Sequence, residues 1–429
     1  MTSRFPSLAY PDVRRYLVAR LLVGFAVQMQ TVAVGWQVYL TTHNPLDLGL
    51  IGLSQFLPFV LLVLPAGHVA DNYDRRRVIF GTYLLAGAAA AALLAYSLSG
   101  FSSVLPIFVI MSLVGIVRAF NMPTNQALLP NLVPRDAYGN AVALNTSTMQ
   151  LATIGGPSLG GVLLIIGTPV VYAIVVVLAV ASAFLVRGLQ TGGRSEPPPG
   201  RSGSGMRELL TGVTFVRLHR PILGSISLDL FAVLFGGATA LLPAIATDVL
   251  HAGPTGLGLL RAAPAVGAAA AGAALAWQPI RGGVGRWLFG GVAVFGLSIL
   301  VFGLSTSFWL SLAALAVLGA SDMVSMFVRH LLVQLQTPDA IRGRVSAVNA
   351  VFIGASNELG EFESGVTAAW WGIVPAVLVG GAATLTVAVA WTLLFPMLWR
   401  LDRFPEAPTR DEREESAREA LRGTAGEPG

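Results

Sequence analysis

Uninterrupted apolar runs, each roughly 20 residues long, recur along the whole of this chain. Residues 78–99, for example, hold no charged side chain, and only short polar loops separate the runs. A helix of that length spans the hydrocarbon core of a bilayer, which is about 30 Å thick. Backbone amides in lipid must be satisfied internally, which leaves helices or a closed barrel. Because polarity does not alternate within the runs, we predict helices.

The small share of charged residues supports a lipid environment. Only 11% of the residues are charged and 54% are hydrophobic, whereas soluble domains carry about 25% charged residues. There is no cysteine, so disulfides and thiolate chemistry are excluded. The first apolar run is long and lacks a small-residue cleavage site, so we expect no cleavable signal peptide.

The apolar runs predict twelve membrane spans. We place them at residues 15–41, 46–70, 78–99, 103–126, 138–166, 169–188, 221–247, 255–278, 286–305, 307–333, 345–370 and 373–399.

The basic residues, all 27 of them arginine, predict the orientation. They gather in alternate loops such as "DNYDRRR" (71–77), whereas the other loops, such as "SGFSS" and "HAGPT", hold none. The positive-inside rule therefore places both termini, the middle loop and residues 71–77 in the cytoplasm. The expected location is the inner (plasma) membrane. Because topology accounts for the arginines, the basic pI of 9.9 does not require a nucleic-acid partner.

A stretch rich in Gly, Pro and Ser, "GLQTGGRSEPPPGRSGSG" (188–205), predicts a flexible linker between the sixth and seventh spans. The amphipathic segment after it predicts a helix on the membrane surface. We therefore divide the chain into two six-helix halves, a linker and a tail. The ranges are 1–188 for the N-terminal half, 189–220 for the cytoplasmic linker with its surface helix, 221–400 for the C-terminal half and 401–429 for the cytoplasmic tail.

An internal repeat supports the two halves. "PRDAYGNAVALN" (134–145) aligns without a gap with "PDAIRGRVSAVN" (338–349), each between the fourth and fifth spans of its half. Parallel repeats of this kind are a transporter architecture, with the substrate site near the membrane midplane. Duplication without transport, as in a receptor, is the alternative.

The loop "GHVADNYDRRRV" (67–78) carries a resemblance. Its Gly67, Asp71, Arg75 and Arg76 resemble the signature loop of the major facilitator superfamily. Asp74 stands where that family usually has glycine, and Asn72 replaces a usual basic residue. These departures, and the string "NELGEFESG" (357–365), resemble the branch that includes the enterobactin exporter. The resemblance covers residues 10–400 or so, and it implies the major facilitator fold, no enzymatic activity and no cofactor.

Gly67, Asp71, Arg75 and Arg76 are the predicted cytoplasmic gate. A carboxylate such as that of Asp71 is favoured at a helix N-terminus. In the resembling family that terminus belongs to the eleventh helix, here around residues 344–346, and the contact latches the cytoplasmic side. We expect the arginines to pair with Asp74 or Asp136. Topology alone would explain Arg76 and Arg77 but not Gly67 or Asp71.

The fifth span contains "GPSLGG", with Gly156, Pro157, Gly160 and Gly161. Proline can kink a helix, and glycines let a neighbouring helix approach closely. Ordinary close packing would explain the glycines. The whole string, however, resembles the family's antiporter motif, which is associated with exporters.

Ionisable groups within spans are costly and are candidates for function. Five acids stand against three arginines there, so we expect at least one carboxyl to carry a proton; static pairs are the alternative. The proton-coupling candidates are Asp229, Asp322, Glu358, Glu361 and Arg118, with Asp322 and Glu361 preferred. Arg118 resembles the helix-4 arginine of the family's proton antiporters, and the repeat places it opposite Asp322.

Polar side chains on the spans are candidates to line a substrate cavity. They are Gln30, Gln37, Gln55, Asn121, Asn125 and Arg329. No Walker A string occurs, and the five histidines lack metal-ligand spacing, so we expect neither ATP nor a metal.

These features predict a secondary active transporter, which we expect to be a monomer. We expect it to export an amphipathic small molecule, a drug or a siderophore, in exchange for protons by alternating access. An importer or a lipid translocator of the same fold is the nearer alternative. A membrane-embedded enzyme or a receptor is the alternative from another class.

Overall fold

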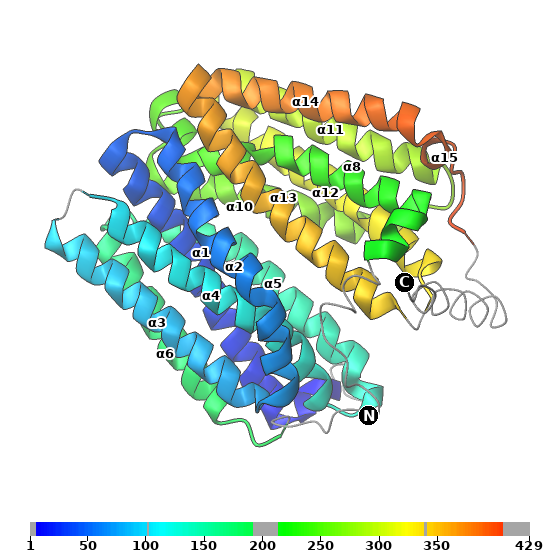
Figure 1. Cartoon of the computed structure of the whole chain (residues 1–429). Helices are drawn as coiled ribbons and strands as arrows, with labels where there is room; N and C mark the ends of the chain where they lie inside the picture. The colour runs from blue at the N-terminus through cyan, green and yellow to red at the C-terminus, as the bar shows by residue number, and fades with distance from the viewer. Residues whose placement is uncertain (1–5, 101–102, 192–212, 339–340, 406–429) are drawn as a thin grey trace, which may run out of the picture. The chain divides into compact units, whose positions relative to one another are not determined.

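The computed structural model describes residues 6–100, 103–191, 213–338 and 341–405, and every regular element among them is a helix (Figure 1). The all-helical prediction is therefore confirmed. The first long helices are α1 (Pro11–Thr42), α2 (Pro45–Asn72), α3 (Arg75–Ser99), α4 (Leu105–Leu128), α5 (Arg135–Leu163) and α6 (Thr168–Arg187). After residues 213–218, also helical, come α8 (Arg220–Phe235), α10 (Gly253–Trp277), α11 (Val284–Leu304), α12 (Phe308–Gln336), α13 (Arg342–Trp371), α14 (Ile373–Leu394) and α15 (Pro396–Trp399).

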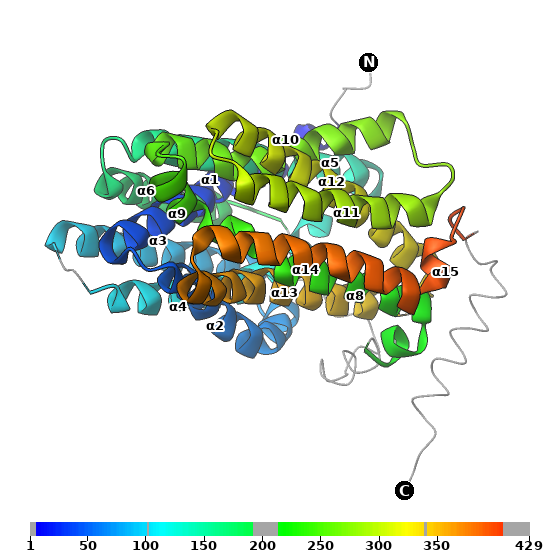
Figure 2. The same ribbon diagram turned by 90° about the horizontal axis from the view of Figure 1, so that it is seen from above.

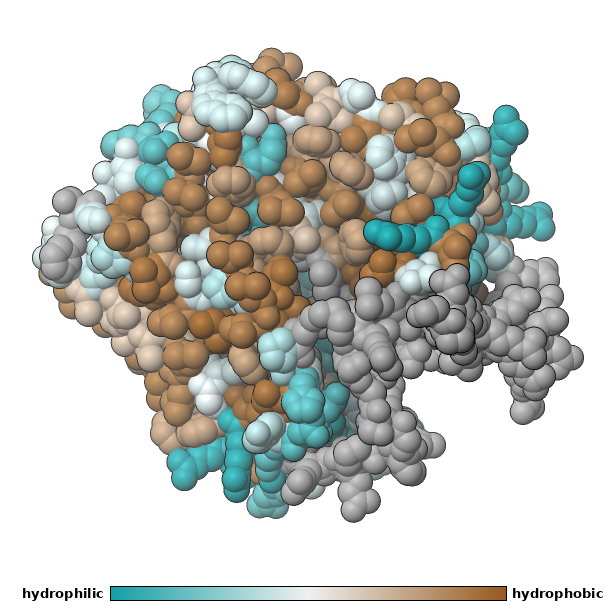
Figure 3. Space-filling view, in the orientation of Figure 1, coloured by the Kyte–Doolittle hydropathy of each residue, from teal (hydrophilic) through white to brown (hydrophobic). Residues whose placement is uncertain are grey.

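Ten helices in the described parts are long and apolar enough to cross a membrane. The predicted spans 138–166 and 345–370 coincide with α5 and α13, which have 29 and 30 residues but carry more polar side chains. Apolar residues cover much of the helical surface in Figure 3, as expected where lipid is the solvent. The chain is thus a multi-pass membrane protein, and the full set of twelve spans stays a prediction.

The predicted seventh span, 221–247, is broken into four pieces. Helix α8 ends at Phe235 and is followed by a 3-10 helix (Gly237–Leu241), the short α9 (Leu242–Ala244) and a π-helix, η4 (Ile245–Val249). A Cβ on Gly237 would lie 2.3 Å from the carbonyl oxygen of Gly360, so the break lies where α8 and α13 come into backbone contact. Helix irregularities of this kind often mark functional positions.

The contacts divide the chain into two compact units. The first unit contains the residues up to 201 together with Thr239–Ala265, and the second contains Ser202–Ala238 and the residues from 266 onward. The segment from the break in the seventh span to the middle of α10 therefore packs with the first six helices. The division at the linker, into residues 1–188 and 221–400, stays a prediction.

Each unit has its own core. In the first, α1 packs against α5 and α6, α2 against α4, and α3 against α6. Tyr16 of α1 and Tyr83 of α3 belong to its buried cluster. In the second, α11 packs against α12 and α14, while α8 packs against α13 and α14; Figure 2 shows α8, α13 and α14 together.

Candidate functional site

A buried ion pair lies inside the second unit. Asp229 of α8 accepts from Arg329 of α12 through its Oδ1, and the two side chains are only 8% and 3% exposed. The arginine Nε is also buried and has no hydrogen-bond partner among the described residues. A charge held away from solvent is tolerated only when an opposite charge and hydrogen bonds compensate it. This guanidinium therefore has donor capacity left for a second acceptor.

A second acid, Asp322, lies on the same helix as Arg329. It lies two helical turns before Arg329 on α12, so both side chains share a face. It also lies within electrostatic reach of Asp229 and Arg329. Asp229, Asp322, Ser325 and Phe295 line an internal space of about 10 Å³, close to the minimum of about 10–15 Å³ for one water. Two carboxyls sharing one guanidinium favour the protonation of one of them.

The acids of α13 belong to the same unit. Glu358 is buried, whereas Glu361 and Glu363 are half-buried. Glu358 and Glu361 each have a polar or electrostatic partner. Gly360 lies between them in the chain and meets the α8 backbone, since a Cβ there would lie 2.8 Å from the Val233 carbonyl oxygen. Both preferred proton carriers, Asp322 and Glu361, thus lie on helices that neighbour α8.

Arg118 lies in the first unit, on α4. Its side chain is exposed, and its guanidinium carbon lies 5.3 Å from the centre of the Phe59 ring on α2, a cation–π contact. The expected partner, Asp322, belongs to the second unit. That pairing stays a prediction.

The arginines of the signature loop tie the first unit together. Arg75 donates to the carbonyl oxygens of Ala70, at the end of α2, and Ala127, at the end of α4, at 3.2 and 3.3 Å. A cation is favoured where helix carbonyls are left without partners. Topology alone therefore does not account for Arg75, because it caps two neighbouring helices.

Asp74 and Arg76 form the expected pair. Arg76 donates to both carboxylate oxygens of Asp74, at 3.3 Å from Nε and 3.0 Å from Nη2. Asp74 also caps α3, since its Oδ1 accepts from the Arg76 amide at 2.9 Å. The hydrogen bond from the Arg76 side chain holds the pKa of Asp74 below its usual value. An aspartate in place of the usual glycine thus begins the third helix.

Asp71 and Gly67 lie on the last turns of α2. Asp71 is exposed, and a Cβ on Gly67 would meet no atom within 4 Å. Close packing among the described residues therefore does not require a glycine at position 67. The proposed partner of Asp71 at residues 344–346 belongs to the other unit, so the latch stays a prediction.

The first residues of the predicted linker, 189–191, contact the first unit, and the linker boundary of 189–220 stays a prediction. Asp12 accepts from the amides of Gln190 and Thr191 at 3.0 and 2.8 Å, and Arg15 donates to the Gly188 carbonyl at 2.7 Å. Residues 192–212 lie outside the described residues. Of the predicted surface helix, residues 213–218 are helical, and Phe215 packs into the second unit.

The glycines of "GPSLGG" lie at close helix contacts. A Cβ on Gly156 would lie 2.6 Å from Gln28 Cβ of α1, and one on Gly160 would lie 3.1 Å from Met29 Cα. Gly161 faces α10, where a Cβ would lie 2.6 Å from the Pro254 carbonyl oxygen. The buried Pro157 lies between these contacts. Helix α5 is therefore held between α1 and the start of α10 at short spacings, and at Gly156 and Gly161 a Cβ would force a neighbouring atom to shift.

The predicted cavity residues make the following contacts, and their role in lining a cavity stays a prediction. Gln37 accepts from the Tyr172 hydroxyl at 2.7 Å, so it joins α1 to α6. Asn125 donates to Asn121 and accepts from the Tyr16 hydroxyl at 3.2 Å. Gln30 is buried on α1, and Gln55 reaches back to its own helix at Ile51, 3.5 Å away. Arg329 belongs to the other unit, in the pair described above.

Two polar features were not predicted from the sequence. Arg20 lies inside the first span near Tyr16 and Tyr83, with its Nε buried; a charge within an apolar run is the signal that would have found it. The second is the hydrogen bond from the Tyr39 hydroxyl of α1 to Asp248 on the π-helix. Residues so far apart in the chain leave no local signal. No group of three His, Asp or Glu side chains among the described residues is arranged to hold a metal.

Comparisons with known proteins identify the family of this chain. The model of the transmembrane secretion effector family matches residues 2–421. The enterobactin exporter EntS of Citrobacter koseri is 29% identical over 93% of this chain and 94% of its own length. The Escherichia coli protein of the same name is 27% identical over the same shares.

Solved structures show the same fold. A bacterial homologue of the human lysosomal transporter Spinster, inward-facing and unoccupied, superposes with a TM-score of 0.69 at 14% identity, over 90% of this chain and 95% of that one. The chain belongs to the transmembrane secretion effector family of major facilitator transporters, and it is therefore a transporter rather than an enzyme.

Proposed function

We propose that this protein exports an amphipathic small molecule from the cytoplasm in exchange for protons, with a catecholate siderophore of the enterobactin type as the first candidate. The observation that carries the substrate class is the alignment of enterobactin exporters along 93% of the chain. The close-packed "GPSLGG" string, which resembles an antiporter motif, supports export over import.

The coupling site of this proposal is Asp322 with the Asp229–Arg329 pair. When Asp322 is protonated, the charges of Asp229 and Arg329 balance each other. When the proton leaves, Arg329 is shared between two carboxylates, and its buried Nε can serve the second one. Charges in a low-dielectric interior interact strongly, so proton loss changes which acceptor the guanidinium prefers. Such a change on α8 and α12 is the step that we assign to alternating access.

Everted membrane vesicles test this proposal. Respiration acidifies the lumen, and an exporter with proton exchange should then accumulate enterobactin there. Asp322→Asn should abolish the gradient-driven accumulation and leave exchange of labelled for unlabelled enterobactin intact. Asp136→Asn, an exposed acid at the start of α5, is the matched control and should behave as wild type.

Three results would count against the proposal. Wild-type vesicles that accumulate enterobactin equally without a proton gradient would contradict proton coupling. Accumulation only in right-side-out vesicles would favour an importer. If Asp322→Asn loses exchange as well, the carboxyl binds substrate, and a cationic substrate becomes the better candidate.

The proposed topology follows the arginines. Twelve spans would place both termini and residues 71–77 in the cytoplasm, in two halves joined by the linker. We propose a monomer in the inner membrane as the transporting species.

A further inference from the structure

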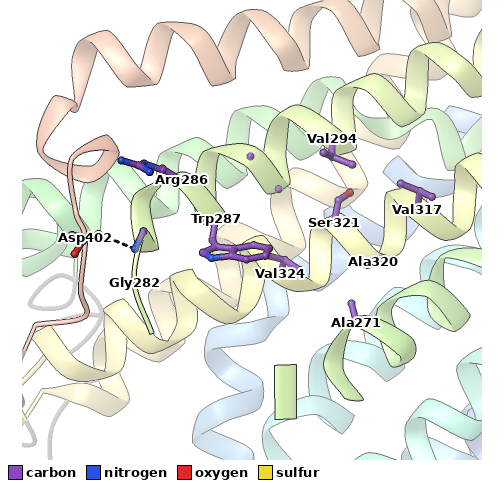
Figure 4. A pocket seen from close by; sticks show the side chains of 13 residues that line it. Ala271, Gly282, Arg286, Trp287, Val294, Val317, Ala320, Ser321, Val324 and Asp402 are labelled. Carbon is purple, nitrogen blue, oxygen red and sulfur yellow. Dashed lines mark hydrogen bonds between the residues drawn. The ribbon is translucent and has the colours of Figure 1, made fainter. Parts of the chain in front are cut away.

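A groove lies on the second unit, and its lining residues differ from those of the internal space beside Asp229 and Asp322. It has a volume of about 770 Å³ and is bounded by α10, α11 and α12 (Figure 4). Its wall is mostly apolar, with Ala271, Val294 and Val317 among the lining residues. Val294 and Val317 are 41% and 47% exposed. Exposed valines on membrane helices indicate contact with lipid chains rather than with water.

Small residues leave this space open. A Cβ on Gly290 of α11 would meet no atom within 4 Å, so this position faces empty space in the groove. Arg286 and Val294 mark its two ends along α11, eight residues apart, which corresponds to about 12 Å at 1.5 Å per residue. A narrow apolar space of that length suits part of an acyl chain.

One end of the groove is basic. Arg286 lines it and is exposed, and Trp287 beside it is 51% exposed. Among the described residues that line the groove, the one acid is Asp402, whose carboxylate accepts from the Gly283 amide at 3.0 Å and keeps its negative charge. Residues 401–402 also accept from the amides of Val284 and Gly285, which places Arg400 and Arg403 of that segment at the same end of α11. Three arginines, Arg286, Arg400 and Arg403, therefore outnumber the carboxylate of Asp402 at this mouth.

We propose that the groove binds one anionic phospholipid from the leaflet at the arginine-bearing end. Its phosphate lies at Arg286, Trp287 lies at headgroup depth, and one acyl chain runs past Gly290 toward Val294. Basic sites between membrane helices bind anionic headgroups, and tryptophan favours the interface. The apolar wall of the groove would contact the acyl chain of the lipid, and Arg286 would bind its negatively charged phosphate. This site is independent of the transported substrate.

Quenching of Trp287 fluorescence tests the proposal. The protein is reconstituted into phosphatidylcholine vesicles that contain a small fraction of either phosphatidylglycerol or phosphatidylcholine with brominated acyl chains. Subtraction of the Trp287→Phe signal isolates the emission of Trp287. We expect the brominated anionic lipid to quench it more than the brominated zwitterionic lipid at equal fraction.

Two variants and two controls separate the parts of the site. Arg286→Gln should reduce the preference for the anionic lipid about fivefold, the contribution of one cation near a membrane surface. Gly290→Leu should fill the groove and remove the excess quenching. Arg77→Gln, an exposed arginine, and Gly81→Leu, an exposed glycine with no atom within 4 Å of its Cβ, should change nothing.

Equal quenching of wild-type Trp287 by the two lipids would overturn the proposal, because it would show that Trp287 contacts bulk lipid with no preference for the anionic one. So would an equal loss in the control variants. If Gly290→Leu does not reach the membrane, the result for Arg286→Gln decides alone.

Discussion

At the scale of single residues, the Asp229–Arg329 pair is the feature with the largest energetic consequence. Both side chains are nearly inaccessible, so neither charge can be hydrated if the other is removed. A buried pair adds little net stability, but breaking it from one side is costly. This asymmetry distinguishes a buried pair from a surface one.

Arg329→Gln should therefore lower the free energy of unfolding by about 3–5 kcal/mol. The double variant Asp229→Asn with Arg329→Gln should recover most of this loss, because no unpaired charge remains. Thermal unfolding of the purified protein in detergent, followed by circular dichroism, measures both. Arg118→Gln is the control and should cost about 0.5–1 kcal/mol, as expected for an exposed cation–π contact. A double variant as unstable as the single one would show that the pair is not the unit of stability.

At the scale of elements, the helices were predictable and their interruptions were not. The apolar runs identified the long helices because lipid imposes one backbone solution on every span. The breaks after Phe235 coincide with Gly236 and Gly237 and with Pro243 at the start of α9. These residues are a local signal for the interruption, but the approach of α8 to Gly360, more than a hundred residues away, is not visible in the sequence. The contact of Asp12 with Gln190 was likewise not predictable, because the two residues lie 178 positions apart in the chain.

The candidate site was predictable in part. Asp229, Asp322 and Arg329 could be singled out because charge inside an apolar run is rare. Which acid pairs with the arginine depends on how α8 and α12 pack, and that information is not local. The hydrogen bonds of Gln37 to Tyr172 and of Asn125 to Tyr16 depend on helix packing in the same way, and the role of both residues in a cavity stays a prediction.

The glycines of α5 give a prediction at this scale. Gly161→Leu should impair transport more than Gly160→Leu, because its side chain would meet the α10 backbone at 2.6 Å rather than Met29 Cα at 3.1 Å. Overpacking of this kind costs about 1–3 kcal/mol. Gly139→Leu, on the same helix but with no atom within 4 Å of its Cβ, is the matched control. Initial transport rates, normalised to protein in the membrane, measure the effect; normal rates in both variants would refute close packing as a requirement.

At the scale of the whole molecule, the orientation in the membrane and the gating are proposals, and the orientation can be tested by cysteine labelling. It contains no cysteine, so a single introduced cysteine is a unique label. Asn72→Cys should react with an impermeant maleimide only in everted vesicles, and Thr306→Cys only in spheroplasts, because the two exposed positions lie in loops of opposite predicted side. Labelling of both from one side would contradict the proposed topology.

The latch at Asp71 belongs to the same scale. If this carboxylate closes the cytoplasmic side at the start of α13, Asp71→Asn should slow transport while protein levels stay normal. Asp136→Asn, also exposed, should not. An outward-open structure with Asp71 in bulk water would contradict the latch.

The central claim is that substrate leaves in exchange for a proton carried by Asp322, and proton movement tests it most directly. Proteoliposomes that enclose a pH-sensitive dye receive enterobactin outside, with no imposed pH gradient and with the membrane potential clamped. Inward movement of enterobactin should then raise the lumenal pH in wild type and leave it unchanged in Asp322→Asn, although that variant still exchanges enterobactin. Wild-type transport without any pH change, or an unaltered pH change in Asp322→Asn, would contradict the account.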